Sequence, residues 1–255
     1  MKKIFILILT VSFLICCEKN KPERFVEING AQLHIKEFGE GKPTVLFENG
    51  MGSSMDTWKS IPDSISKDTR VFSYDRSGTG KSELTPSEKK IPFMVDELRA
   101  LLSKENINPP YIYVAHSMGS YLARYFAIHY PDELQALVLV DPSPDKLYDG
   151  YSQEEYNEFK EIGNQSFANS SVGERKEWEN YLDNRKYVQN APVSDDITMV
   201  IVSATQWDFY DFHSQIMNNN KNSRHLKIDG GHDIHQERPE RIIEIIRDLL
   251  DQSRN

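Results

Sequence analysis

One run, residues 111–120, limits the fold more than any other part of the chain. Its first half, residues 111–115, is rich in aromatic and β-branched residues and predicts a strand. Ser117 follows after one residue, His116, with the small residues Ala115 and Gly119 two positions to either side. Apolar residues then recur at helical spacing. A serine between a strand and a helix lies in a tight, strained turn that only small neighbours permit. The run therefore predicts a serine whose hydroxyl is exposed above a sheet.

The rest of the chain alternates short strands with helices. From Arg24 apolar and polar residues alternate, turn at Asn29-Gly30 and alternate again, which predicts a β-hairpin. Five further β-rich runs follow, mostly separated by helix-like stretches: Thr44–Glu48, Arg70–Tyr74, Leu137–Asp141, Thr198–Ser203 and His225–Asp229. After Pro239, isoleucine and leucine recur at helical spacing and predict a last helix. This order predicts an α/β fold with a mostly parallel central sheet and helices on both faces.

The stretch 142–196 differs from its surroundings. It is polar and rich in Tyr, Asn, Glu and Lys, and it contains no strong strand before Thr198. We interpret it as a helical cap insertion over the edge of the sheet. The domain as a whole is then predicted to cover residues 24–255.

Charge and cysteine content narrow the classes of partner. The 30 Lys and Arg residues against 39 Asp and Glu residues give a net charge of −9, which argues against binding of nucleic acid. The two cysteines, Cys16 and Cys17, are adjacent and lie near the beginning of the chain. No disulfide or thiolate metal site is therefore expected in the domain.

The first residues have the order of a targeting segment. Lys2 and Lys3 precede a mostly apolar stretch, Ile4–Ile15, which is too short to cross a hydrocarbon core of about 30 Å comfortably. The stretch ends at Cys16-Cys17 and turns polar at once, so it resembles the lipobox of bacterial lipoproteins. The resemblance implies a signal peptide over residues 1–16, acylation of Cys17, and a polar tether over residues 17–23. Anchoring at Cys16 is disfavoured because bulky Ile15 would precede the cut, and an uncleaved N-terminal anchor is the alternative. The expected location is the cell envelope, outside the cytoplasm, on a lipid bilayer.

The stretch around Ser117, residues 111–120, resembles the nucleophile elbow of the α/β-hydrolase family, with Ala115 where the family usually has glycine. Residues 44–54 resemble the family's strand and Gly-rich loop, with Asn49 where histidine is frequent. The resemblance implies an oxyanion hole made by the backbone N–H groups of Met51 and Met118. Residues 74–82 resemble a structural turn of the family, in which we expect Asp75 and Arg76 to bond locally.

The resemblance also implies a base and an acid. His232 stands after the last predicted strand and before the last helix, where the family carries its general base. The orienting acid is Asp141, at the end of one strand, or Asp208, after the next strand; the order favours Asp141. His232 and His235 could form a metal pair, but no Asp, Glu or Cys pattern supports it, and we predict no metal site.

These residues imply a serine hydrolase that cleaves an ester-like bond of a small molecule without a cofactor. A carboxylic ester is the first expectation, and a thioester or an amide is also open. Two alternatives stand beside it: a cofactor-free lyase on the same residues, as in hydroxynitrile lyases, and a non-catalytic lipoprotein that binds a partner or a hydrophobic ligand. The sequence predicts neither the substrate nor the oligomeric state.

Overall fold

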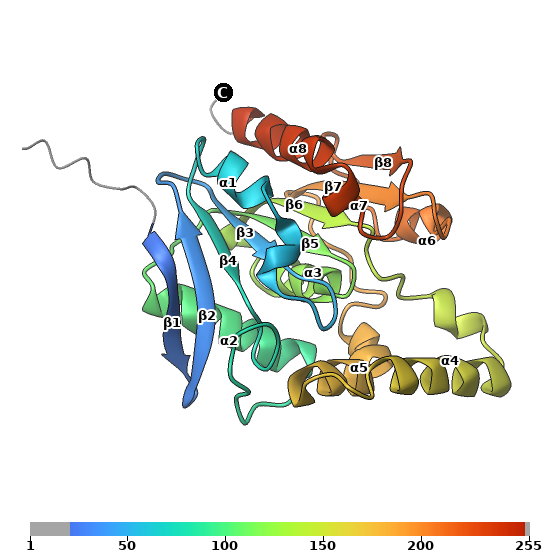
Figure 1. Ribbon diagram of the computed structural model, residues 1–255. Helices are drawn as coiled ribbons and strands as arrows, with labels where there is room; N and C mark the ends of the chain where they lie inside the picture. Colours follow the sequence, from blue (N-terminus) through green and yellow to red (C-terminus); the bar gives the residue numbers. More distant parts are fainter. Residues whose placement is uncertain (1–20, 253–255) are drawn as a thin grey trace, which may run out of the picture.

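The computed structural model describes residues 21–252, and its eight strands form one sheet (Figure 1). The strands are β1 (Lys21–Ile28), β2 (Ala31–Phe38), β3 (Thr44–Glu48), β4 (Val71–Tyr74), β5 (Tyr111–His116), β6 (Leu134–Val140), β7 (Thr198–Ala204) and β8 (Arg224–Ile228). The α-helices are α1 (Ile61–Ile65), α2 (Ile91–Lys104), α3 (Gly119–His129), α4 (Gln153–Ser166), α5 (Val172–Asn184), α6 (Tyr210–Ser214), α7 (Ile234–Glu237) and α8 (Pro239–Gln252). Short 3₁₀ helices are η1 (Met55–Trp58), η2 (Pro131–Glu133), η3 (Leu147–Gly150) and η4 (Arg185–Tyr187).

The sheet has the strand order β1-β2-β4-β3-β5-β6-β7-β8. Strand β2 pairs antiparallel with both of its neighbours, and every other pair is parallel. The hairpin between β1 and β2 turns at Asn29 and Gly30, which both have positive φ (52° and 81°). The predicted α/β class with a mostly parallel sheet is confirmed.

The beginning of the domain differs from the prediction. Strand β1 starts at Lys21 and pairs with β2, so residues 21–23 belong to the sheet and not to a tether. The predicted signal peptide and Cys17 lie outside the described residues. Within residues 21–252, no helix has both the length and the apolar character needed to cross a membrane.

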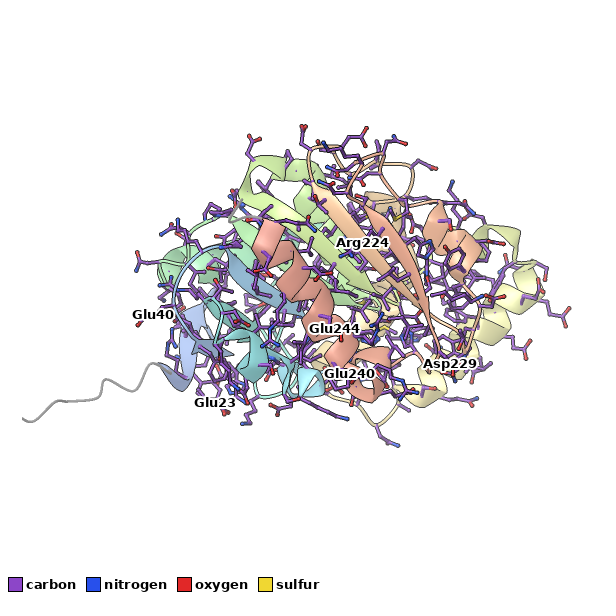
Figure 2. The ribbon with its side chains drawn as sticks, turned by 90° about the horizontal axis from the view of Figure 1, so that it is seen from above. Glu23, Glu40, Arg224, Asp229, Glu240 and Glu244 are labelled. Carbon is purple, nitrogen blue, oxygen red and sulfur yellow. The ribbon has the colours of Figure 1, made fainter. Side chains whose placement is uncertain are left out.

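Helices cover both faces of the sheet, and each face has its own apolar core. Helices α2 and α3 and the cap pack on one face, while α1 and α8 pack on the other. Helix α8 begins at Pro239 and buries one stripe, Ile242, Ile245, Ile246, Leu249 and Leu250. Its exposed Glu240 and Glu244 lie along the helix in front of the sheet (Figure 2).

The stretch 142–196 is helical, and α4 and α5 run together at the opposite side of the sheet from α8 (Figure 1). Each helix starts with a capping box: Ser152 with Glu155 in α4, and Ser171 with Glu174 in α5. In such a box the serine accepts the N3 backbone N–H and the glutamate accepts the N-cap N–H, which fixes where the helix begins. These local signals explain why a polar segment forms helices here.

Candidate active site

Ser117 lies between the end of β5 and the start of α3 with a φ of +50°, a strained value for a residue with a side chain. Its backbone N–H donates to the carbonyl oxygen of Val140 (3.1 Å), which ties the turn to β6. A Cβ on Gly119 would lie 2.5 Å from the carbonyl oxygen of Asn49. Glycine at this position therefore lets the turn pack against the loop that follows β3.

His232 connects Ser117 to Asp141. Its Nε2 lies 2.9 Å from Oγ of Ser117, and its Nδ1 lies 2.6 Å from Oδ2 of Asp141. Asp141 is only 3% exposed, and its Oδ1 accepts the backbone N–H of Ala204 (2.9 Å). Because the carboxylate only accepts, Nδ1 carries the proton and Nε2 is free to accept the serine proton.

Asp208, the other acid suggested by the sequence, is not part of this arrangement. Its Oδ1 pairs with Nζ of Lys227 at 2.6 Å, and its side chain is 73% exposed. The residue before it, Trp207, lies against His232 with ring centroids 4.7 Å apart. The structure therefore brings Asp141, and not Asp208, to the imidazole.

A buried histidine that sequence reasoning missed holds the backbone at Pro142, the residue after Asp141. Nε2 of His213 donates to the carbonyl oxygen of Pro142 (2.7 Å), so its Nδ1 accepts the hydroxyl of Ser203 (2.6 Å). Burial lowers the pKa of His213, which favours this neutral form. A lone histidine in a short helix has no sequence pattern that could have revealed it.

The two backbone N–H groups expected to form an oxyanion hole are available. Among the hydrogen bonds of the described residues, none has the N–H of Met51 or Met118 as its donor. Met118 is the residue before α3, and Met51 lines the same cavity as Ser117. Two unpaired N–H groups, one on the residue after Ser117 and one on a residue of the same cavity, suit a developing negative charge.

A cavity of about 520 Å³ opens over Ser117 and His232 beneath the cap. Eight aromatic side chains line its wall: Tyr148, Tyr151, Phe159, Phe167, Trp178, Tyr181, Trp207 and Phe209. None of the described residues that line it is Asp, Glu, Lys or Arg. The cavity therefore suits an uncharged, apolar group.

A histidine cluster lies beside the site. Ligand atoms of His116, Asp233 and His235 lie within 4.8 Å of one another, so a carboxylate does approach His235, contrary to the sequence pattern. Nε2 of His116 is already hydrogen-bonded to the backbone oxygen of His232 (2.9 Å), and we assign no ion to the cluster. Burial lowers the pKa of His116, and it lowers the pKa of His235 to about 3, so both rings are neutral near pH 7.

Asp75 bonds locally as expected, but both Asp75 and Arg76 also bind segments outside their turn. Asp75 accepts the nearby N–H of Lys81 (2.9 Å) but also that of Met55 (2.7 Å). Arg76 reaches Glu48 and, in the cap, Glu177. The turn at 74–82 therefore joins distant segments.

Comparisons with known proteins agree with this architecture. Residues 43–215 match the family described as alpha/beta hydrolase fold. The uncharacterized protein YqjL of Bacillus subtilis (strain 168) is 26% identical over 229 residues, which span 85% of this chain and 87% of that protein. A thermophilic esterase from Thermogutta terrifontis superimposes with a TM-score of 0.66 at 19% identity, covering 91% of this chain and 98% of that one. The Cif epoxide hydrolase from Acinetobacter nosocomialis superimposes with a TM-score of 0.73 at 16% identity, covering 90% and 88%.

Proposed function

The chain belongs to the α/β-hydrolase fold family, and we propose that it is a serine hydrolase that cleaves an ester-like bond by acyl transfer to water. A carboxylic ester is the first candidate for that bond, with a thioester or an amide as the other forms of the same chemistry. The observation that carries the proposal is the continuous hydrogen-bonded series from Ser117 through His232 to Asp141. The esterase and the epoxide hydrolase among the structural neighbours share this fold.

In the proposed reaction Oγ of Ser117 attacks the substrate carbonyl carbon while its proton passes to Nε2 of His232. Asp141 stabilises the imidazolium through Nδ1, and the N–H groups of Met51 and Met118 bind the oxyanion. The imidazolium then gives the proton to the leaving group, which departs as an alcohol, thiol or amine. Water, deprotonated by His232, attacks the acyl-serine and releases the acid. The chain's own side chains and amides suffice for every step.

The cavity supports a substrate with an uncharged apolar group. A charged group would lose its hydration there without meeting a partner, which costs several kcal/mol. Aromatic walls instead offer a large contact area to acyl chains and rings. We therefore propose a neutral, apolar ester-like substrate.

For location, we propose that Cys17 carries a lipid and tethers the domain to a bilayer outside the cytoplasm. The support is the order of charged, apolar and cysteine residues at the beginning of the chain. Strand β1, which follows the proposed anchor in the sequence, is an edge strand far from α4 of the cap (Figure 1). A tether at this edge would leave the cavity open to solvent.

Labelling with a fluorophosphonate probe tests the function. The probe modifies a serine only when its base and oxyanion hole activate it, so we expect the wild-type protein to be labelled and the Ser117→Ala variant to be unlabelled. Absence of labelling in the folded wild type would favour the non-catalytic binding protein. Labelling that survives Ser117→Ala would reject Ser117 as the nucleophile.

A further inference from the structure

The oxyanion loop, which we define as residues 49–52, is held on both sides of Met51. The carbonyl oxygens of Asn49 and Gly50 accept Nη1 and Nη2 of Arg76, each at 2.7 Å. The N–H of Gly52 donates to Oε2 of Glu177 at 2.9 Å. The peptide groups around Met51 are thus fixed by two side chains, while the N–H of Met51 itself is left unpaired.

Arg76 and Glu177 also bind each other. Nε and Nη2 of the guanidinium donate to the two carboxylate oxygens of Glu177, both at 2.8 Å, and Nη1 donates to Glu48 at 2.7 Å. Arg76 is 2% exposed, and both glutamates are 0% exposed. Burial alone would raise the pKa of Glu177, but the charge and hydrogen bonds of Arg76 outweigh it and hold the pKa below its usual value. Glu177 is therefore a buried carboxylate at neutral pH.

Glu177 comes from the cap, 125 residues after Gly52 in the sequence. It lies on α5, whose first turn rests directly on the turn at residues 74–82. A Cβ on Gly173 would lie 2.3 Å from the carbonyl oxygen of Gly78, and the hydroxyl of Ser171 donates to that same oxygen at 2.8 Å. Because α5 meets this turn backbone to backbone, its docking fixes where the carboxylate of Glu177 stands.

We propose that Arg76 and Glu177 are positioning residues for the oxyanion hole, so that docking of the cap helix α5 sets the direction of the Met51 N–H. This inference rests on the proposed acyl-transfer function and extends it. The cap lines the substrate cavity, and through Glu177 it also positions one of the two N–H groups that stabilise the oxyanion in the transition state. A loop released from Glu177 and Arg76 loses one preorganised donor, and removal of one such donor typically lowers kcat about 10²- to 10³-fold.

Glu177→Ala and Glu177→Gln test the proposal with p-nitrophenyl hexanoate as substrate. We expect Glu177→Ala to lower kcat about 10²-fold or more with little change in KM, because the oxyanion exists only after attack. Glu177→Gln keeps an acceptor for the N–H of Gly52, so we expect its kcat to fall less than that of Glu177→Ala. The affinity for a trifluoromethyl ketone, whose serine adduct carries an oxyanion, should fall in parallel with kcat/KM.

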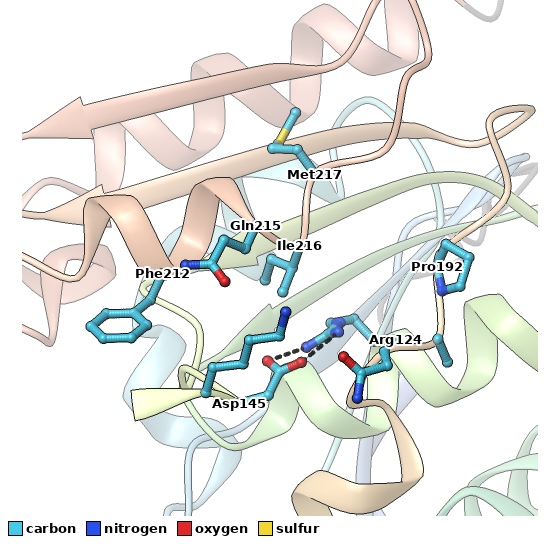
Figure 3. Close-up of a pocket in the computed structure, with 10 residues that line it drawn as sticks. Arg124, Asp145, Pro192, Phe212, Gln215, Ile216 and Met217 are labelled. Atoms are coloured by element: carbon cyan, nitrogen blue, oxygen red, sulfur yellow. Dashed lines mark hydrogen bonds and ion pairs between the residues drawn. The ribbon is translucent and has the colours of Figure 1, made fainter. Parts of the chain in front are cut away.

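A matched control is the buried ion pair of Arg124 with Asp145, which also joins α3 to the first residues of the cap (Figure 3). Its two hydrogen bonds measure 2.6 and 2.9 Å, and the other hydrogen bonds of the two residues go to Val188 and Arg185, not to the oxyanion loop. Asp145→Asn should lower thermal stability while kcat stays within about twofold, since it removes a buried pair without touching the loop. Should Glu177→Ala fail to fold, Gly173→Ala keeps the side chains of both ion pairs in the sequence while its Cβ pushes α5, and with it Glu177, away from the turn at residues 74–82. It should give the same loss of kcat.

Amide hydrogen exchange of residues 50–54 gives a readout that needs no turnover. We expect faster exchange in Glu177→Gln and Gly173→Ala than in wild type or Asp145→Asn. Unchanged exchange, or a rise in KM with kcat unchanged, would overturn the positioning role even in an active enzyme. A wild-type protein that neither turns over esters nor reacts with the fluorophosphonate would instead overturn the proposed function, and faster exchange would still support the bracing of the loop by Glu177.

Discussion

Replacing Asp141 by Asn tests most directly the proposed roles of Ser117, His232 and Asp141. Both oxygens of the Asp141 carboxylate are engaged: Oδ2 with Nδ1 of His232 at 2.6 Å, and Oδ1 with the N–H of Ala204 at 2.9 Å. An asparagine whose oxygen keeps the bond to Ala204 turns its NH₂ group toward Nδ1, which must then accept. The imidazole is pushed into the tautomer with a proton on Nε2, and it can no longer accept the proton of Ser117.

The expected loss follows from that tautomer. A wrong tautomer with intact geometry costs on the order of 10⁴ in kcat, which corresponds to about 5.5 kcal/mol in activation free energy. Steady-state hydrolysis of p-nitrophenyl hexanoate measures it, with circular dichroism to show that the variant is folded. Asp208→Asn is the matched control, because it breaks only the exposed pair with Lys227 and should leave kcat within about twofold. A loss below tenfold for Asp141→Asn, or an equal loss for Asp208→Asn, would refute the assignment.

Three further predictions concern the anchor, the cavity and acid stability. Cys17→Ala should release the protein from membranes or block its processing, whereas Cys16→Ala should remain in the membrane fraction; unchanged fractionation of Cys17→Ala would contradict the lipid anchor. The p-nitrophenyl monoester of adipic acid should show kcat/KM about 10²-fold below the hexanoate of equal chain length, because its carboxylate finds no partner in the cavity; equal values would reject a neutral substrate. Burial lowers the pKa of His235 to about 3, so the unfolded state binds the extra proton and the free energy of unfolding falls as pH drops from about 6.5 toward 3. Urea titrations at several pH values between 6.5 and 4.5 give the free energy of unfolding at each pH. In His235→Phe this free energy should change less steeply with pH than in wild type, by up to about 1.4 kcal/mol per pH unit, whereas a variant of the exposed His129 should show the wild-type dependence.

Sequence reasoning succeeded where a signal is local. Local signals are the alternation of apolar and polar residues in strands, the Asn29-Gly30 turn and the small residues around Ser117. Each of them depends only on residues a few positions apart, and each element that they predict is present. It failed where partners are distant. Local bonding of Arg76 was expected from its turn, but the guanidinium binds Glu177 about a hundred residues later. No pattern in a polar helix marks one glutamate among many as buried, because burial depends on how the cap docks.

The spacing of residues in the sequence left both Asp141 and Asp208 as candidates for the acid, and the order of the strands in the sheet explains why Asp141 is the one that meets His232. Strand β6 lies next to β5, so a residue at its end is close to Ser117. The segment after β8 reaches back across the end of β7 and brings His232 to within 2.6 Å of Asp141. Asp141 is fixed there by its own N–H to the carbonyl oxygen of Val202 (2.7 Å) and by its side chain to the N–H of Ala204. With the acid at β6, the end of β7 carries no charge into the site. Its Trp207 instead lies against His232 and lines the cavity, so the place that Asp208 would have taken as the acid serves as an apolar wall for the substrate.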